Sequence, residues 1–252
     1  MIYGLSLSTA GAMASQHRME VLSNNLANVG TAGFKRELAA FKVAPLEADL
    51  RGAGPAFRHP VVDGIGGGIF ALPTHTDLSV GPLRHTESPS DLAIAGEGFF
   101  LVGAKDGKRL TRDGRLSVTA DGRLVRATGG EPLLDEAGQG IDLDPQQPFT
   151  VTSDGTVLQA GEQVGRLAVV SADSKALQKA GNGLFRVSDK VTPEPVAGPQ
   201  VRQGYIEESG VEPTIELTNL ILATRTYEMN VRMLQQQDQT LGRLINTVAK
   251  PG

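Results

Sequence analysis

The residue types that most often do chemistry in proteins occur in this chain, but their spacing matches no common catalytic or metal-binding pattern. No two histidines are spaced i, i+4 on a predicted helix or placed in an HExxH motif, which disfavours a zinc site. The chain has no cysteine, which excludes disulfides, thiolate ligands and cysteine nucleophiles. The histidines are His17, His59, His75 and His85. The sequence therefore predicts neither a bound metal nor thiol chemistry.

The carboxylates, glycines and serines of the chain also match no common catalytic or phosphate-binding motif. Glu207 and Glu208 are adjacent, and adjacent side chains in a strand point to opposite faces, which disfavours a paired-carboxylate site. The glycine clusters at 64–68 and 96–98 complete neither GxGxxG nor a P-loop motif, and the second precedes a predicted strand. The GxSxG elbow of serine hydrolases is absent around Ser8, Ser88 and Ser153. We expect no enzyme activity, no cofactor and no small-molecule substrate.

The composition of the chain is that of an ordinary globular protein and disfavours nucleic-acid binding. The chain has 252 residues, enough for a substantial core, and 40% of them are apolar, as in ordinary globular proteins. The formal net charge is −4, and the absence of a long run of one sign gives no reason to expect a nucleic-acid partner. Tryptophan is absent and only three tyrosines and eight phenylalanines occur, so few side chains could stack on bases.

The N-terminal segment from Ile2 to Asn28 is predicted to form a helix. It contains no proline, and its apolar residues Leu5, Met19 and Leu26 lie on a seven-residue grid with Ala12. Two glycines inside the segment weaken the helix by about 1 kcal/mol each. We therefore expect this helix to need a packing partner.

The same segment resembles a signal peptide only superficially. Ala12-Met13-Ala14 imitates a cleavage site, but no basic residue precedes Arg18 and polar residues interrupt the apolar stretch. We therefore expect no cleaved signal. No apolar run reaches the ~20 residues that span a bilayer.

The segment from Pro213 to Val248 is the most strongly predicted helix. Pro213 suits the first helical position, and Pro251 ends the pattern. Read in heptads, the a positions are Leu217, Thr224, Val231, Asp238 and Ile245, and the d positions are Leu220, Tyr227, Leu234, Leu241 and Val248. A second apolar set lies beside this seam: Ile221, Leu222, Met229, Met233 and Leu244. The heptads predict a partner helix, without indicating whether that partner belongs to the same chain.

The middle of the chain is predicted to be β-rich. From about 77 to 206, short apolar runs alternate with turns, and Asp-Gly pairs at 106, 113, 121 and 154 favour two-residue hairpins. The clearest hairpin joins 116–119 to 124–125, and further strands are expected at 99–102, 149–151 and 167–170. Residues 37–76 read as an extended connector with one or two short strands.

Together these patterns predict an α+β fold. Its N- and C-terminal helices would pair as a coiled coil, and a mostly antiparallel β domain would lie between them in sequence. The expected division is a helical domain of 1–36 with 207–252, a connector of 37–76 and a β domain of 77–206.

Several segments resemble one known family in the same order along the chain. They are 24–36 (NNLANVGTAGFKR), 91–100 (DLAIAGEGFF), 111–114 (TRDG), 121–125 (DGRLV), 203–211 (QGYIEESGV) and 223–229 (ATRTYEM). In residue types and order they are similar to the signatures of the flagellar basal-body rod and hook proteins. The short connector, with 164–167 and 183–186, is most similar to the proximal rod members, and the distal rod members are the near alternative.

This resemblance implies a structural subunit of the bacterial flagellar rod, spanning the periplasm in the basal body. Such a subunit would be exported by the flagellar type III apparatus without a cleaved signal, and would polymerise with copies of itself and other rod proteins through its terminal helices. The expected assembly-interface residues are Leu5, Met19, Leu22, Asn25, Leu26, Asn28, Phe34, Leu217, Leu220, Tyr227, Val231, Leu234, Leu241, Ile245 and Val248. The alternatives are a distal rod or hook member, an enzyme carried on the rod, and a monomeric β-type binding module.

Overall fold

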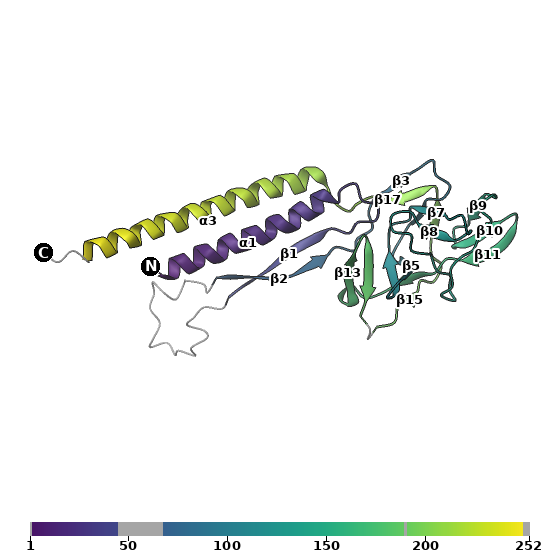
Figure 1. The fold of residues 1–252 in the computed structure, drawn as a ribbon, viewed down its shortest axis with the longest axis horizontal. Coiled ribbons are helices and arrows are strands. Elements are labelled where there is room, and N and C mark those ends of the chain that lie inside the picture. Colours follow the sequence, from purple (N-terminus) through teal and green to yellow (C-terminus); the bar gives the residue numbers. More distant parts are fainter. Residues whose placement is uncertain (1, 45–67, 189–190, 249–252) are drawn as a thin grey trace. The chain divides into compact units, whose positions relative to one another are not determined.

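The computed structural model describes residues 2–44, 68–188 and 191–248 (Figure 1). The chain forms two compact units. The helical unit comprises Met1–Ala27, Glu37–Thr76 and Glu212–Gly252, and the β unit comprises Asn28–Arg36 and Asp77–Val211. The sequence-based division placed 28–36 and 207–211 with the helices. In the structure these two segments hydrogen-bond to each other inside the β unit, from Gly33 N to Glu207 O (2.8 Å) and from Gly210 N to Phe34 O (3.0 Å).

The two predicted helices are confirmed and lie side by side (Figure 1). Helix α1 spans Ile2–Ala27 and α3 spans Pro213–Val248. They run antiparallel, because Gly4 lies opposite Gln237 and Gly11 lies opposite Asn230. Within the described residues, neither helix is both long and apolar enough to cross a membrane.

The packing face of α3 is only partly the predicted seam. The d positions Leu220, Tyr227, Leu234 and Leu241 are half-buried, but the a positions Leu217 and Ile245 are 49% and 64% exposed. Four residues that each precede an a position by one are buried or half-buried instead. They are Glu216, Ala223, Asn230 and Gln237. The shift arises because Gly4 and Gly11 of α1 leave room for the Gln237 and Asn230 side chains.

The connector contains two antiparallel strands, β1 (Glu37–Val43) and β2 (Ile69–Thr76), with an irregular register between Leu38 and Ala40. Its glycine- and proline-rich middle, 45–67, lies outside the described residues, as does His59. The strand pair packs on α1. Asn25, which is fully buried, donates to Glu37 O (2.8 Å) and accepts from Glu37 N (2.9 Å).

The β unit is built from short antiparallel strands, as the sequence predicts. Six of them form one sheet in the order β13-β14-β6-β5-β12-β15, and β9, β10 and β11 form a three-stranded sheet. The remaining strands pair as β16 with β4, β17 with β3 and β7 with β8. The strands are β3 (Leu83–His85), β4 (Leu92–Ile94), β5 (Phe99–Ala104), β6 (Gly107–Thr111), β7 (Leu116–Val118), β8 (Leu124–Arg126), β9 (Phe149–Val151), β10 (Thr156–Gln159), β11 (Glu162–Arg166), β12 (Val169–Ser171), β13 (Leu177–Gly181), β14 (Leu184–Val187), β15 (Glu194–Pro195), β16 (Val201–Gln203) and β17 (Tyr205–Glu207), with a 3-10 turn η2 (Ser174–Ala176) before β13.

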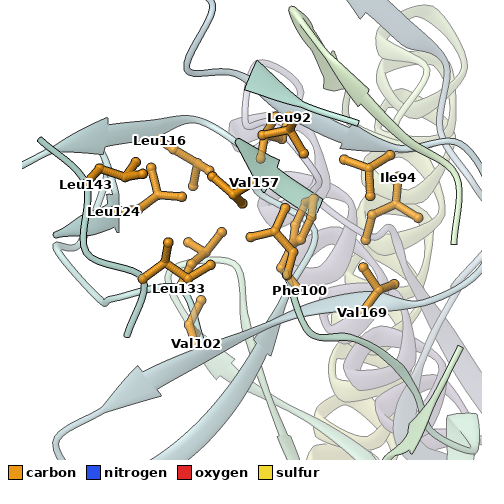
Figure 2. Close-up of a cluster of buried hydrophobic side chains, with 14 residues drawn as sticks. Leu92, Ile94, Phe100, Val102, Leu116, Leu124, Leu133, Leu143, Val157 and Val169 are labelled. Carbon is orange, nitrogen blue, oxygen red and sulfur yellow. The ribbon is translucent and has the colours of Figure 1, made fainter. Parts of the chain in front are cut away.

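The main core of the β unit lies among these sheets. Aliphatic side chains from many strands converge around Phe100, which is 1% exposed (Figure 2). Leu124 and Val157, from β8 and β10, are fully buried in the same cluster. A second cluster, around Phe99 and Phe185, uses side chains of the six-stranded sheet that alternate with those of the first. The alternation lets one sheet contribute to two cores.

Three of the four Asp-Gly pairs lie at hairpin turns, but none forms the two central residues of the two-residue loop that the sequence predicts. At 120–122 and 153–155 the loop has three residues, and only the glycine of the pair adopts a left-handed backbone (φ +83° at Gly122, +87° at Gly155). In the β5–β6 hairpin Ala104 pairs with Gly107, so the two loop residues are Lys105 and Asp106. Gly114 belongs to no hairpin turn: a Cβ there would lie 1.6 Å from Leu92 O. A three-residue loop needs only one positive φ, which glycine provides alone.

Candidate assembly interface

Helix α3 carries a stripe of exposed apolar side chains along its length. The α3 stripe consists of Ile215, Leu222, Met229, Met233 and Leu244, which are between 40% and 63% exposed. At 3.6 residues per turn their spacing places them within an arc of roughly 60°, over about 43 Å of helix. The sequence analysis identified four of these five residues as a second apolar set.

The polar residues within the stripe are uncharged. Thr218, Thr226 and Thr240 lie between the apolar side chains, and each hydroxyl donates to the carbonyl four residues earlier at 2.8 Å. Because these donors bond to their own helix, the threonines present mainly their methyl groups. The exposed Gln236 lies beside Met233 and Thr240, so the stripe is an uncharged surface that is apolar except at this amide.

The helical unit also has a groove of about 420 Å³ in which α1, α3 and the β1–β2 pair meet. Leu7, Gly11 and Ala14 line it from α1, and Phe41 and Ile69 line it from the strands. Phe41 contacts His17 edge to face, with ring centroids 6.1 Å apart. Thr226 and Asn230 complete the groove from α3, so it adjoins the α3 stripe.

The expected interface residues lie in several environments. Leu22 and Asn25 are buried within the helical unit, and Leu217 and Ile245 are the exposed members. The Val248 side chain lies outside the described residues. The half-buried residues are Leu5, Met19, Leu26, Asn28, Phe34, Leu220, Tyr227, Val231, Leu234 and Leu241.

A buried charge cluster in the β unit was not anticipated from the sequence. The Glu207 cluster consists of Lys35, Arg112 and Glu207, whose side chains are 1 to 2% exposed. Lys35 Nζ donates to Glu207 Oε1 (2.6 Å), and Arg112 Nη1 donates to Glu207 Oε2 (3.1 Å). Burial lowers the pKa of both cations, and the Glu207 charge opposes that effect. One carboxylate thus serves two buried cations.

Backbone groups complete the Glu207 cluster. Lys35 Nζ also donates to Ser79 O (2.6 Å), Arg112 Nη2 donates to Gly96 O (2.7 Å), and Gly81 N donates to Glu207 Oε1 (2.9 Å). At Gly33, with φ +66°, a Cβ would lie 2.4 Å from the Arg112 carbonyl carbon, so the signature glycine permits this approach.

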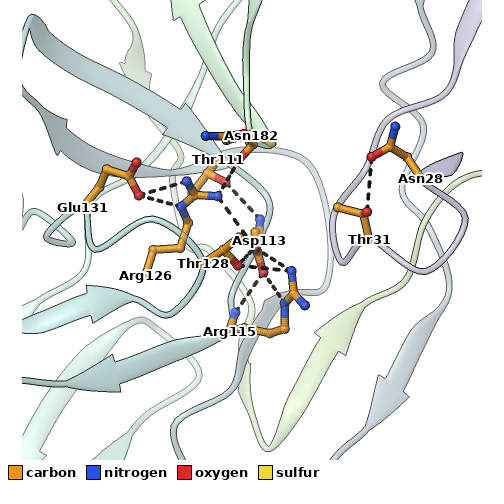
Figure 3. Close-up of polar contacts among 10 residues, drawn as sticks. Asn28, Thr31, Thr111, Asp113, Arg115, Arg126, Thr128, Glu131 and Asn182 are labelled. Atoms are coloured by element: carbon orange, nitrogen blue, oxygen red, sulfur yellow. Dashed lines mark hydrogen bonds and ion pairs between the residues drawn. The ribbon is translucent and has the colours of Figure 1, made fainter. Parts of the chain in front are cut away.

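The Asp113 side chain is the centre of a second polar cluster (Figure 3). It accepts from Arg115 Nε (2.9 Å) and from the Thr128 hydroxyl (3.0 Å). Arg126, which is fully buried, lies 3.7 Å from the same carboxylate and donates to Glu131 (2.9 Å). This cluster ties β8 to the segment that follows β6, so it has a structural role in the β unit.

Residues of the signature segments thus meet in the folded protein although they are far apart in sequence. The motifs quoted from the sequence contain Lys35, Arg112 and Glu207, but spacing alone does not bring them together. The available signal was only that each of the three residues lies within a signature segment. Among the described residues, no group of three histidine, aspartate or glutamate side chains is placed to hold a metal.

Comparison with known protein families finds matches to three regions of the chain, and these regions contain Lys35, Arg112 and Glu207. Residues 6–35 match the family described as flagella basal body rod protein, and residues 93–159 match the flagellar hook protein FlgE/F/G D1 domain. Residues 202–247 match the C-terminal region of the flagellar basal body rod FlgEFG proteins. Each matched region contributes one residue to the Glu207 cluster.

Whole-chain relatives agree with these matches. The flagellar basal-body rod protein FlgF of Caulobacter vibrioides is 37% identical, over 88% of each chain. FlgF of Salmonella typhimurium is 31% identical over 94% of this chain and 96% of its own. FlgG of Buchnera aphidicola subsp. Schizaphis graminum is 33% identical over 97% of this chain and 99% of its own. The chain therefore belongs to the flagellar basal-body rod protein family.

Proposed function

We propose that this chain is a non-enzymatic structural subunit of the flagellar rod, located in the basal body. It polymerises through its terminal helices with copies of itself and with other rod proteins. The observation that carries the proposal is the α3 stripe, an exposed apolar surface about 43 Å long. A helix of a monomeric protein normally presents charge to solvent, whereas a contiguous apolar surface marks an interaction site.

The helix pair is the element that carries the assembly surface. The d positions of α3 stay half-buried within the subunit, which supports the pairing of α1 with α3 inside one chain. The α3 stripe and the exposed Leu7 and Met13 of α1 remain for neighbouring subunits. The groove beside Phe41 and Ile69 adjoins this surface and extends it.

Export of the chain proceeds through the flagellar type III apparatus. Gly4 and Gly11 support this step, because they make an isolated α1 marginally stable and easy to keep unfolded. Packing against α3 then stabilises α1. A proximal rod position is favoured by the 37% identity to a FlgF, and a distal rod position is the alternative.

The test introduces the same charge on and off the α3 stripe. Met229→Asp places a carboxylate in the stripe, and Gln239→Asp places one on another exposed face of α3. Because Met229 is 63% exposed, its substitution is expected to change the stability of the purified chain by no more than about 0.5 kcal/mol. Cells that carry Met229→Asp as their only copy should lose rod incorporation and motility, whereas cells with Gln239→Asp keep both.

A second variant tests the helix pair itself. Leu234→Asp places a charge at a half-buried d position, so it should block assembly while the β unit stays folded. Normal motility and incorporation in both Met229→Asp and Leu234→Asp would refute assembly through these helices. The monomeric binding-module alternative would then be favoured.

A further inference from the structure

The geometry points to the Glu207 cluster as a clamp that couples folding of the β unit to pairing of α1 and α3 within one chain. The inference concerns the isolated chain, so it can fail while the proposed function stands. It begins from where the cluster lies in the chain. Lys35 follows α1 by eight residues, and Glu207 precedes α3 by six. The cluster therefore holds both connections to the helices.

Backbone hydrogen bonds reinforce the contact between the two connecting segments. Gly33 N donates to Glu207 O at 2.8 Å, and Gly210 N donates to Phe34 O at 3.0 Å. Lys179 of β13 holds the first of these segments, since its ammonium donates to Lys35 O (2.7 Å) and lies 4.3 Å from the Phe34 ring centroid. Residues 33–35 and 207–210 are thus held together in the β unit.

Chain connectivity gives this contact an energetic consequence for the helices. When the clamp is open and the β unit is unfolded, pairing α1 with α3 must close the whole loop between Ala27 and Pro213. With the clamp closed, only the short stretches between each helix and the clamp remain free. Loop-closure entropy scales with about three halves of the logarithm of loop length, so the closed clamp favours intramolecular pairing by roughly a hundredfold.

The clamp depends most on Glu207, because this residue carries the only negative charge of the cluster. Glu207 is hydrogen-bonded to both Lys35 and Arg112, and the Arg112 Nε atom is buried without a hydrogen-bond partner. Removing the carboxylate leaves two buried cations without their paired anion, which is a costly arrangement. Removing Lys35 instead leaves a balanced pair of Arg112 and Glu207. The two substitutions are therefore expected to differ in severity.

Hydrogen exchange on the full-length chain tests the inference. Glu207→Gln should speed exchange in segments 31–36 and 208–212, and should lower protection of α1 and α3 by a factor below the roughly hundredfold limit of the fully open loop. Strands β5, β6 and β12 should keep their protection, because their apolar cores remain. Lys35→Met should give the same pattern with a smaller change. The matched control is Glu208→Gln, whose half-exposed side chain pairs with Arg84 (2.8 Å), and it should leave the helices unchanged.

Three results would overturn the clamp. Unchanged α1 and α3 protection in Glu207→Gln would show that the helices pair independently of the cluster. Loss of protection in β5, β6 and β12 in both Glu207→Gln and Lys35→Met would make the cluster an ordinary part of the β core. Wild-type helix protection that rises with protein concentration would show that α1 and α3 pair between copies rather than within one chain.

Discussion

The helical unit and the β unit of this protein differ in which kinds of side chain they bury. In the β unit, large apolar side chains such as Phe100, Leu124 and Leu133 are almost completely buried, and even Lys35 and Arg126 are enclosed with partners. In the helical unit the buried set includes many small or polar residues: Ser8, Ala12, Ser15, Asn25 and Ala223. Several large apolar residues of its helices and strands stay exposed, among them Phe70, Met229 and Met233.

Under the proposed function, this contrast separates stability from assembly. Most large apolar side chains of the β unit are buried, whereas the helical unit carries exposed apolar surface of the kind that marks an interaction site. Substitutions in the β unit should therefore change stability. Substitutions on the exposed face of the helical unit should chiefly change assembly.

The largest expected effect comes from the β core. Phe100→Ala removes a side chain that is 1% exposed, and the lost burial together with the resulting cavity should cost about 3–5 kcal/mol of unfolding free energy. Denaturant unfolding measures this cost. Met229→Ala, in the α3 stripe, is the comparison and should change the same quantity by less than about 0.5 kcal/mol. Similar losses in both variants would remove the distinction between the units.

A medium effect is expected where the two helices approach each other. A Cβ on Gly11 would lie 3.0 Å from Asn230 Oδ1, so Gly11→Leu should force the helices apart at a cost of about 1–3 kcal/mol. Exchange of the α1 amides measures this loss. Gly242 has no atom within 4 Å of the corresponding position, so Gly242→Ala should instead stabilise α3 by about 1 kcal/mol. A stabilising Gly11→Leu would contradict the close approach.

The smallest effect concerns a surface turn of the β unit. Hydrogen bonds from the Thr152 and Thr156 hydroxyls lower the pKa of Asp154 to about 2, from an ordinary value of 3.8. A depressed carboxyl pKa contributes stability above the ordinary value, and this contribution is lost as the pH falls through the folded-state value. Asp154→Asn should therefore be less stable than the wild type at pH 6, and most of the difference should be lost by pH 2. Thermal unfolding across this range measures it.

The Thr156→Val variant is the control for this turn. It keeps the carboxylate but removes one hydroxyl donor, which lies 2.9 Å from Asp154 Oδ2. Its effect should have the same sign and a smaller size. A difference between Asp154→Asn and the wild type that stays constant from pH 6 to pH 2 would show that the ionised carboxylate is not responsible.

Local patterns were sufficient to predict much of the fold. The bounds of α3 follow from Pro213 and the heptads, and β9 was predicted at its observed bounds. Periodicity and turn residues act over a few neighbours, so they can be read along the chain. The family signatures were equally readable, because they are contiguous. The loop lengths were not, since an Asp-Gly pair is compatible with more than one hairpin geometry.

The face of α3 that packs on α1, and the Glu207 cluster, were decided only by tertiary structure. Heptad counting favoured Leu217 and Ile245 for the seam, but the glycines of α1 accept Asn230 and Gln237 instead. Lys35, Arg112 and Glu207 are separated by most of the chain, and nothing in their local sequence specifies that they meet. Sequence by itself determined which segments form helices and strands, because that choice is local. Which side chains become neighbours depends on how distant surfaces fit, and this was settled by the folded structure.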